Sequence, residues 1–197
     1  MWRAFSGVEI SPAVCLLAAW FAMDNGWRLL GMVLSAAVAH ELGHCLALWL
    51  LGAPVTGLRI GIFGAELAAE RRYLSYAGEL AAVLAGPGAN LLLALMLTVL
   101  GGTRWAALTG ANLTLCAFNL LPVRPLDGGR ALCLLFTWAI GPGTGEQTAR
   151  WVGAAAALLL AALLGYVMWE SGGSLWLLPA AAGLSAAAWR EIWGLHR

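Results

Sequence analysis

The chain has 197 residues, of which 61% are hydrophobic and only 11% are charged. A soluble domain of this length needs far more charge on its surface, so the composition indicates an integral membrane protein. The formal net charge is +1, and the eleven basic residues, all arginines, form no basic stripe, which excludes nucleic acid as an expected partner.

Apolar stretches close to the ~20 residues that a bilayer-crossing helix needs predict about six transmembrane helices. Polar, glycine-rich or proline-rich segments separate them. The predicted spans are residues 10–23, 28–51, 80–100, 105–121 with an apolar continuation to 138, 151–169 and 174–189. Because Pro122 and Pro125 interrupt the fourth stretch, we treat it as one broken helix. We therefore expect an all-α polytopic membrane protein.

The arginines test this layout independently. With the N-terminus in the cytoplasm, six spans leave Arg28 and Arg104 outside and the other nine arginines inside, as the positive-inside rule expects. The opposite orientation would invert this ratio. We therefore expect both termini to be cytoplasmic.

Residues 53–79 do not read as a span. Residues 55–64 alternate in apolar character and are rich in glycine, which suggests a short membrane-associated β-hairpin; a simple loop is the alternative. A free hairpin edge could pair with an extended substrate, so Gly61, Ile62 and Phe63 are candidate substrate-binding residues.

The run His40-Glu41-Leu42-Gly43-His44 lies within the second predicted span. Histidines at i and i+4 share one helix face, so both imidazoles can reach one zinc ion. Zinc lowers the pKa of a bound water towards 7, and Glu41 is placed to take its proton. We interpret Gly43 as room for a bound peptide backbone. The alternative is a chance match, but two of the three histidines lie here, and a glutamate inside a span tends to mark function.

A catalytic zinc needs a third protein ligand and one open position. His196, the remaining histidine, is interpreted as a solvated residue of the C-terminal tail. Asp127 lies at the inner end of the broken span, where prolines and glycines free the backbone to approach the second span. From chemistry alone, Asp127 is either a metal ligand or a helix N-cap before Gly128.

Three asparagines lie in apolar surroundings. Asn90 and Asn112 are explained by hydrogen bonding between packed helices, although Asn90 is also a candidate substrate-binding residue. Asn119 is closer to the expected metal site along the chain. It is a candidate for holding the substrate backbone or the oxyanion.

Taken together, these motifs resemble the site-2 protease family of intramembrane metalloproteases over about residues 10–140. The matching segments are His40-Glu41-Leu42-Gly43-His44, Gly86-Pro87-Gly88-Ala89-Asn90, and Asn119 to Arg130, which contains Leu126-Asp127-Gly128-Gly129. The resemblance is closest to the bacterial branch that includes stage IV sporulation protein FB, which cuts a membrane-associated sigma-factor precursor.

The resemblance implies Zn²⁺ as cofactor, Asp127 as third ligand and Glu41 as general base. It implies a single intramembrane domain over residues 1–197, with a catalytic core at about 27–140 and C-terminal helices at about 150–190. It also implies cleavage of a peptide bond in or near the transmembrane segment of a membrane protein, such as a sigma-factor precursor or an anti-sigma factor. Expected partners are a membrane-spanning or membrane-associated substrate, the lipid bilayer and a membrane regulator, and the expected location is a bacterial cytoplasmic membrane.

Two other functions compete with this one. Intramembrane histidines and carboxylates also mark ion pathways, so a zinc or cation transporter is one alternative. However, no carboxylate or histidine lies between Trp151 and Trp169 or between Leu175 and Trp189, whereas a transporter usually spreads ligands through the membrane depth. A proteolytically inactive membrane scaffold is the other, but Glu41 and all three expected ligands are present.

Overall fold

The computed structural model describes residues 7–61, 64–69, 74–170 and 178–193. The described elements are β1 (Val8–Ile10), α1 (Pro12–Asn25), α2 (Trp27–Leu50), β2 (Val55–Gly61), β3 (Gly64–Ala69), α3 (Tyr76–Gly101), the 3-10 helix η2 (Gly102–Trp105), α4 (Ala106–Asn119), α5 (Asp127–Ile140), α6 (Pro142–Glu170) and α7 (Leu178–Trp193). The chain divides into two compact units, Met1–Phe118 and Asn119–Arg197, which are described in turn.

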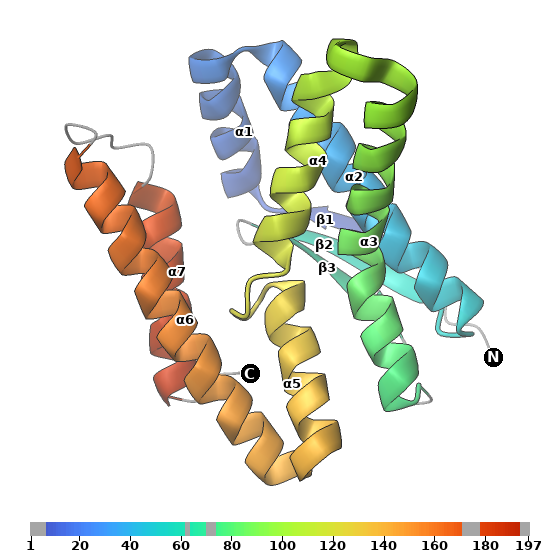
Figure 1. Cartoon of the computed structure of the whole chain (residues 1–197), viewed down its shortest axis with the longest axis vertical. Coiled ribbons are helices and arrows are strands. Elements are labelled where there is room, and N and C mark those ends of the chain that lie inside the picture. Colours follow the sequence, from blue (N-terminus) through green and yellow to red (C-terminus); the bar gives the residue numbers. More distant parts are fainter. Residues whose placement is uncertain (1–6, 62–63, 70–73, 171–177, 194–197) are drawn as a thin grey trace. The chain divides into compact units, whose positions relative to one another are not determined.

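In the first unit, α2 packs against both α1 and α3 (Figure 1). Small residues let α2 and α3 approach closely. A Cβ on Gly43 would lie 2.5 Å from the carbonyl oxygen of Ala85 and 2.7 Å from the Cβ of Ala89, which is too close for either atom. The interpretation of Gly43 as room for a substrate backbone is therefore wrong, because α3 fills that space.

A β-hairpin is present as predicted, but it extends beyond residues 55–64 to Ala69 and is part of a larger sheet. β2 and β3 pair antiparallel, with Arg59 opposite Glu66. β1, which was not predicted, pairs parallel to the other edge of β2, so the strand order is β1-β2-β3. A core cluster of Leu48, Ala53 and Ala82 ties the sheet to α2 and α3, with Val55 and Leu67 packed against it.

In the second unit, α6 packs against α5 and against α7. Figure 1 shows α6 and α7 running alongside one another. Their core is a cluster of mostly small apolar side chains, which lets the helices lie close together: Val123, Leu126, Ala157, Leu184, Ala187 and Ala188.

The predicted fourth span is divided into two helices. α4 ends at Asn119 and α5 begins at Asp127, with residues 120–126 between them. Pro122 lacks a backbone N–H and disfavours helix in the residue before it, and Pro125 follows a cis peptide bond. α4 and α5 each have 14 residues, which is about 21 Å of helix and short of a ~30 Å hydrocarbon core.

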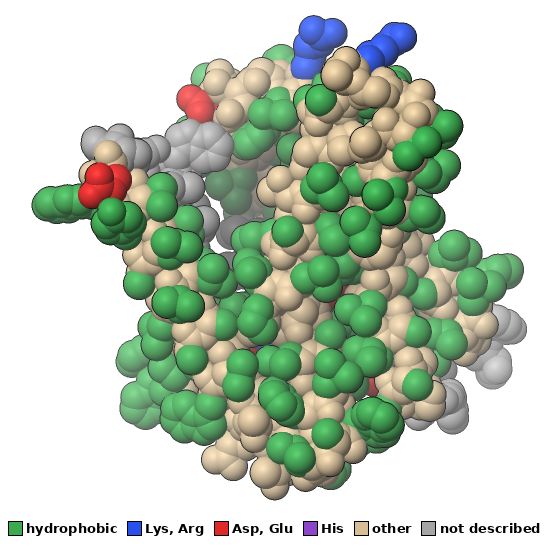
Figure 2. Space-filling view, viewed as in Figure 1, with side chains coloured by type: hydrophobic (Ala, Val, Ile, Leu, Met, Phe, Trp, Pro, Cys, Tyr) green, Lys and Arg blue, Asp and Glu red, His purple; other side chains and the backbone are tan. Residues whose placement is uncertain are grey.

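Membrane-compatible length and composition are found in three helical stretches of the described chain: Trp27–Leu50, Tyr76–Asn119 and Pro142–Glu170. Large apolar side chains are exposed along them, including Trp49 at 65% and Val99 at 80%. Figure 2 shows hydrophobic side chains spread over the visible face of the molecule. Water is a poor solvent for such a surface and lipid a good one, so the chain is an integral, predominantly helical membrane protein with a small sheet.

Candidate metal centre

The two histidines of the predicted motif are buried together on α2. They lie one helical turn apart, with 4% and 8% of the surfaces of His40 and His44 exposed. The Nε2 atoms of the two rings are 3.1 Å apart, and the ring planes are 82° from parallel. The predicted shared helix face is therefore confirmed in detail.

The other nitrogen of each ring faces an oxygen. His44 Nδ1 lies 2.8 Å from the carbonyl oxygen of Ala82, and His40 Nδ1 lies 2.7 Å from Oδ1 of Asn90. A backbone carbonyl only accepts hydrogen bonds, so His44 carries its hydrogen on Nδ1 when neutral and keeps a lone pair on Nε2. When His40 likewise carries its hydrogen on Nδ1, toward the Asn90 oxygen, the lone pairs on the Nε2 atoms of the two histidines point at one another.

This arrangement fits a cation. Two unprotonated nitrogens facing one another across 3.1 Å repel, whereas a shared metal ion attracts both. Two nitrogens that bind zinc at 2.0–2.1 Å with a tetrahedral angle lie roughly 3.3 Å apart, so a small opening of the pair is enough. The oxygens at both Nδ1 atoms are the partners that metal-binding histidines usually have.

α3 holds the His44 ring in place. A Cβ on Gly86 would overlap the ring, with Cε1 at 2.6 Å and Cδ2 at 2.7 Å. Gly86 thus gives the imidazole room to lie against the α3 backbone, where the Ala82 carbonyl is available. Glu41 follows His40 on α2 and is partly buried.

Asp127 is the first residue of α5, in the second unit, and is buried. Leu126 holds the N-cap position and makes no side-chain cap hydrogen bond, so Asp127 does not occupy the position that the N-cap interpretation required. Asp127 lies in the first turn of the helix, where the backbone N–H groups attract negative charge. Asn119 is partly buried at the end of α4.

Two glycines seat the first turn of α5 on the loop before it. A Cβ on Gly128 would overlap the carbonyls of Leu120 and Leu121, and one on Gly129 would lie 2.6 Å from the backbone nitrogen of Arg124. The loop is itself hydrogen-bonded, from Leu126 N to the Val123 carbonyl at 2.9 Å. The backbone on both sides of Asp127 is therefore closely packed, which fixes the position of its Cα atom.

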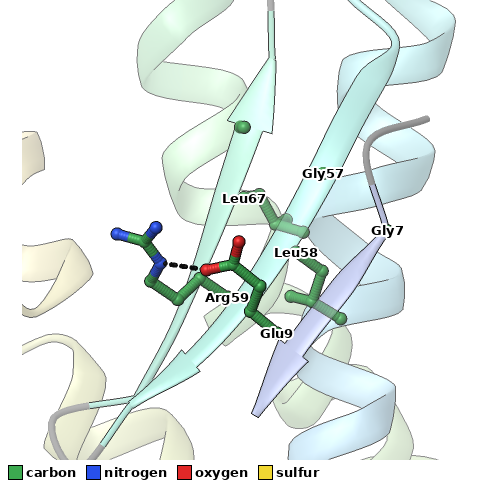
Figure 3. Close-up of a pocket in the computed structure, with 7 residues that line it drawn as sticks. Gly7, Glu9, Gly57, Leu58, Arg59 and Leu67 are labelled. Atoms are coloured by element: carbon green, nitrogen blue, oxygen red, sulfur yellow. Dashed lines mark hydrogen bonds and ion pairs between the residues drawn. The ribbon is translucent and has the colours of Figure 1, made fainter. Parts of the chain in front are cut away.

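The candidate substrate-binding residues of the hairpin are only partly within the described structure. Gly61 ends β2, whereas Ile62 and Phe63 lie outside the described residues. A pocket of about 310 Å³ is lined by residues of the same sheet. In Figure 3, two of these residues, Glu9 of β1 and Arg59 of β2, point toward one another. Their exposed ion pair, 2.9 Å long, joins the two parallel strands and contributes little stability.

Sequence reasoning did not connect Asn90 to the metal site. Asn90 has no exposed surface, and its oxygen and amide nitrogen contact His40, Ala36 and Asn112. Asn90 therefore has the contacts needed to orient His40, and its role as a substrate-binding residue stays a prediction. In the sequence, Asn90 stands out as a polar residue in an apolar helix and as the last residue of the segment Gly86-Pro87-Gly88-Ala89-Asn90, and neither signal points to a contact with His40.

The chain is similar in sequence to several known proteins. No protein-family model matches the chain. It is 35% identical over 125 residues to "Putative zinc metalloprotease sll0528" of Synechocystis, an overlap of 59% of this chain and 32% of that protein. It is 33% identical over 181 residues to "Putative zinc metalloprotease Rip3" of Mycobacterium tuberculosis, an overlap of 81% and 44%.

Stage IV sporulation protein FB of Bacillus subtilis is 28% identical over 137 residues, or 66% of this chain and 48% of that protein. The chain thus spans less than half the length of these curated relatives. Among solved structures, the site-2 protease from Methanocaldococcus jannaschii has a TM-score of 0.67 at 20% identity, covering 97% of this chain and 93% of that one. The two proteins share a fold.

Proposed function

This chain belongs to the site-2 protease family, and we propose that it is an intramembrane zinc metalloendopeptidase. It would hydrolyse a peptide bond in or near the transmembrane segment of a membrane protein. The observation that carries the proposal is the buried histidine pair of α2, whose Nε2 atoms converge to 3.1 Å beside Glu41 in a helix apolar enough to cross a membrane.

We propose His40, His44 and Asp127 as the zinc ligands. Two neutral imidazoles and one carboxylate form a usual ligand set for catalytic zinc, which keeps a fourth position open. Two supports are the Nδ1 contacts of both histidines and the burial of Asp127 at a helix N-terminus. The ligands come from both compact units, so residues 1–197 would act as one intramembrane domain.

When bound, zinc would supply a Lewis acid that polarises a carbonyl and makes water acidic near pH 7. Glu41 would accept the proton of the attacking water and pass it to the leaving amine. Asn119 would donate a hydrogen bond to the substrate backbone or to the oxyanion. Burial of the histidines in a helical, apolar region would limit bulk water at the site.

We propose that the sheet holds the substrate in an extended form. A helical substrate must unwind before cleavage, since its own hydrogen bonds shield the peptide bond. Among the described strands, β3 lies at the end of the order β1-β2-β3, and a substrate strand would add beside it by backbone hydrogen bonds. We propose Gly61, Ile62 and Phe63 as residues that would contact that strand.

The substrate class and the orientation are further parts of the proposal. The predicted spans place nine arginines on the cytoplasmic side and two on the other side, which favours cytoplasmic termini. We propose a bacterial cytoplasmic membrane as the location. Cleavage from the cytoplasmic side suits a membrane-associated sigma-factor precursor or an anti-sigma factor, and a membrane regulator would control it.

Glu41→Gln tests the reaction class. The amide cannot accept the proton, so we expect at least a ~100-fold loss of cleavage while zinc content stays at one per chain. Zinc would be measured by elemental analysis of the purified full chain, and cleavage by immunoblot of co-expressed, tagged single-span membrane proteins. Wild-type cleavage by Glu41→Gln would refute the general-base role, and zinc flux in proteoliposomes would favour a transporter.

Asp127→Asn tests the third ligand. A neutral amide is a poor zinc ligand, so we expect the variant to lose zinc to a chelator that leaves the wild type loaded. Asn119→Ala serves as the control, since it should retain zinc and lose only cleavage. Equal zinc retention by Asp127→Asn and the wild type would show that the carboxylate serves only the helix terminus.

A further inference from the structure

We propose that Asn90 selects the metal-binding tautomer of His40, and that Asn112 holds Asn90 in the orientation this requires. This inference rests on the proposed function, because the tautomer matters to the reaction only if His40 is a ligand. Asn90 and Asn112 are positioning residues in this proposal. They act on the metal through His40.

The first step is the orientation of the Asn90 amide. Its nitrogen lies 2.9 Å from the carbonyl oxygen of Ala36 on α2. A carbonyl oxygen only accepts, so the atom facing it must be the NH₂ group. The oxygen of the same amide is then the atom 2.7 Å from His40 Nδ1, and it must accept a hydrogen from that ring.

The second step extends the argument to α4. Asn112 donates from Nδ2 to the Leu108 carbonyl at 2.9 Å, which turns its oxygen toward Asn90. That oxygen accepts the second amide hydrogen of Asn90 at 2.8 Å. Neither asparagine has exposed surface, so water cannot replace these bonds. Turning the Asn90 amide over would set its oxygen against two acceptors and its NH₂ against the His40 hydrogen.

These hydrogen bonds form a relay from Asn112 on α4 through Asn90 on α3 to His40 on α2. The relay fixes the hydrogen of His40 on Nδ1. Nε2 of His40 is left with its lone pair toward Nε2 of His44, as zinc binding needs. The two histidines depend on different groups. His44 uses the backbone carbonyl of Ala82, which no side-chain substitution removes, whereas His40 depends on two side chains.

This asymmetry gives a direct measurement. The chain has three histidines, so ¹⁵N-histidine labelling of the full chain in nanodiscs yields few ring signals. In zinc-free protein at a pH where the rings are neutral, the nitrogen shifts report which nitrogen carries hydrogen. We expect hydrogen on Nδ1 of both His40 and His44 in the wild type, and a shift toward Nε2 at His40 alone in Asn90→Leu.

Other variants separate tautomer selection from simple packing. Asn90→Asp keeps an oxygen that accepts from His40, so it should restore the Nδ1–H form, while its second oxygen faces the Ala36 and Asn112 acceptors and should lower the stability of the fold. Asn112→Leu should shift the His40 tautomer partly, because the Ala36 carbonyl is then the one remaining acceptor of the two that orient the Asn90 amide nitrogen. This variant keeps the proposal testable if Asn90→Leu does not fold. Thr98→Val is the matched control. It removes a partly buried side-chain hydrogen bond elsewhere on α3 and should change neither ring.

Zinc affinity, measured by chelator competition, provides a second readout. We expect Asn90→Leu to weaken zinc binding about 10–100-fold and Thr98→Val to leave it unchanged. An unchanged His40 tautomer in Asn90→Leu would overturn the proposal, and so would equal changes at His40 and His44. If the tautomer responds as expected but the wild type neither retains zinc nor cleaves, the relay stands and the protease proposal fails.

Discussion

Substitution of Gly86 by alanine gives the sharpest test of the site geometry. A Cβ at this position would lie 2.6 Å from Cε1 and 2.7 Å from Cδ2 of the His44 ring. Carbon atoms normally pack 3.5–4.0 Å apart, so the ring must retreat by about 1 Å. Zinc–nitrogen distances tolerate only about 0.2 Å, so this retreat removes Nε2 from a position where it can bind.

The expected effects on stability and on function differ in size. Overpacking costs about 1–3 kcal/mol, part of which the higher helix propensity of alanine offsets by about 1 kcal/mol. The unfolding temperature in detergent should therefore fall only slightly. Cleavage should fall about 100-fold, as expected for a 1 Å misplacement of a catalytic group, and zinc affinity should fall with it.

Gly88→Ala is the matched control, two residues along the same helix. A Cβ there meets nothing within 4 Å, so this variant should bind zinc as the wild type does and be equally or slightly more stable. The assays are chelator competition for zinc and thermal unfolding in the same detergent. Wild-type zinc affinity in Gly86→Ala would refute the reasoning, and equal losses in both variants would assign the effect to the helix backbone.

Two further substitutions, one in each unit, test how the helices and loops pack. Gly43→Ala places a Cβ 2.5 Å from the carbonyl oxygen of Ala85, a backbone atom that cannot turn away. The free energy of unfolding, measured by thermal unfolding, should therefore fall by about 1–3 kcal/mol. Wild-type stability in this variant would contradict the close contact between α2 and α3. In the second unit, Arg124 Nε lies 3.8 Å from Oε1 of Glu191, whose side chain is 1% exposed. Arg124→Met removes a charge partner of a buried carboxylate and should cost up to about 3 kcal/mol in a denaturant titration, whereas Arg59→Met, which breaks only an exposed pair, should cost less than about 1 kcal/mol.

Local patterns carried much of the fold prediction. The apolar stretches predicted the helices because length and hydrophobicity decide whether a segment suits a bilayer. Alternation with glycine predicted a hairpin at residues 55–64, which contains β2, whereas β3 runs on to Ala69 beyond the predicted segment. The β1 strand was missed because it has three residues and exists only by pairing with β2, about 50 positions along the chain. The burial of Glu191 was missed for a similar reason. Its neighbour Arg124 belongs to a distant loop, and nothing near position 191 indicates it.

For the metal site, the sequence by itself determined that His40 and His44 share a helix face, since a spacing of four residues is a property of the helix. It also singled out Asp127, whose role as a ligand stays a prediction. Only the tertiary structure decided which nitrogens face one another. Asn90 contacts His40, which lies 50 residues earlier in the sequence, and Gly86 contacts the ring of His44, which lies 42 residues earlier. Both contacts therefore depend on the packing of α3 on α2. Local periodicity places side chains on a face, but the hydrogen bonds that orient an imidazole come from whichever helix packs against that face.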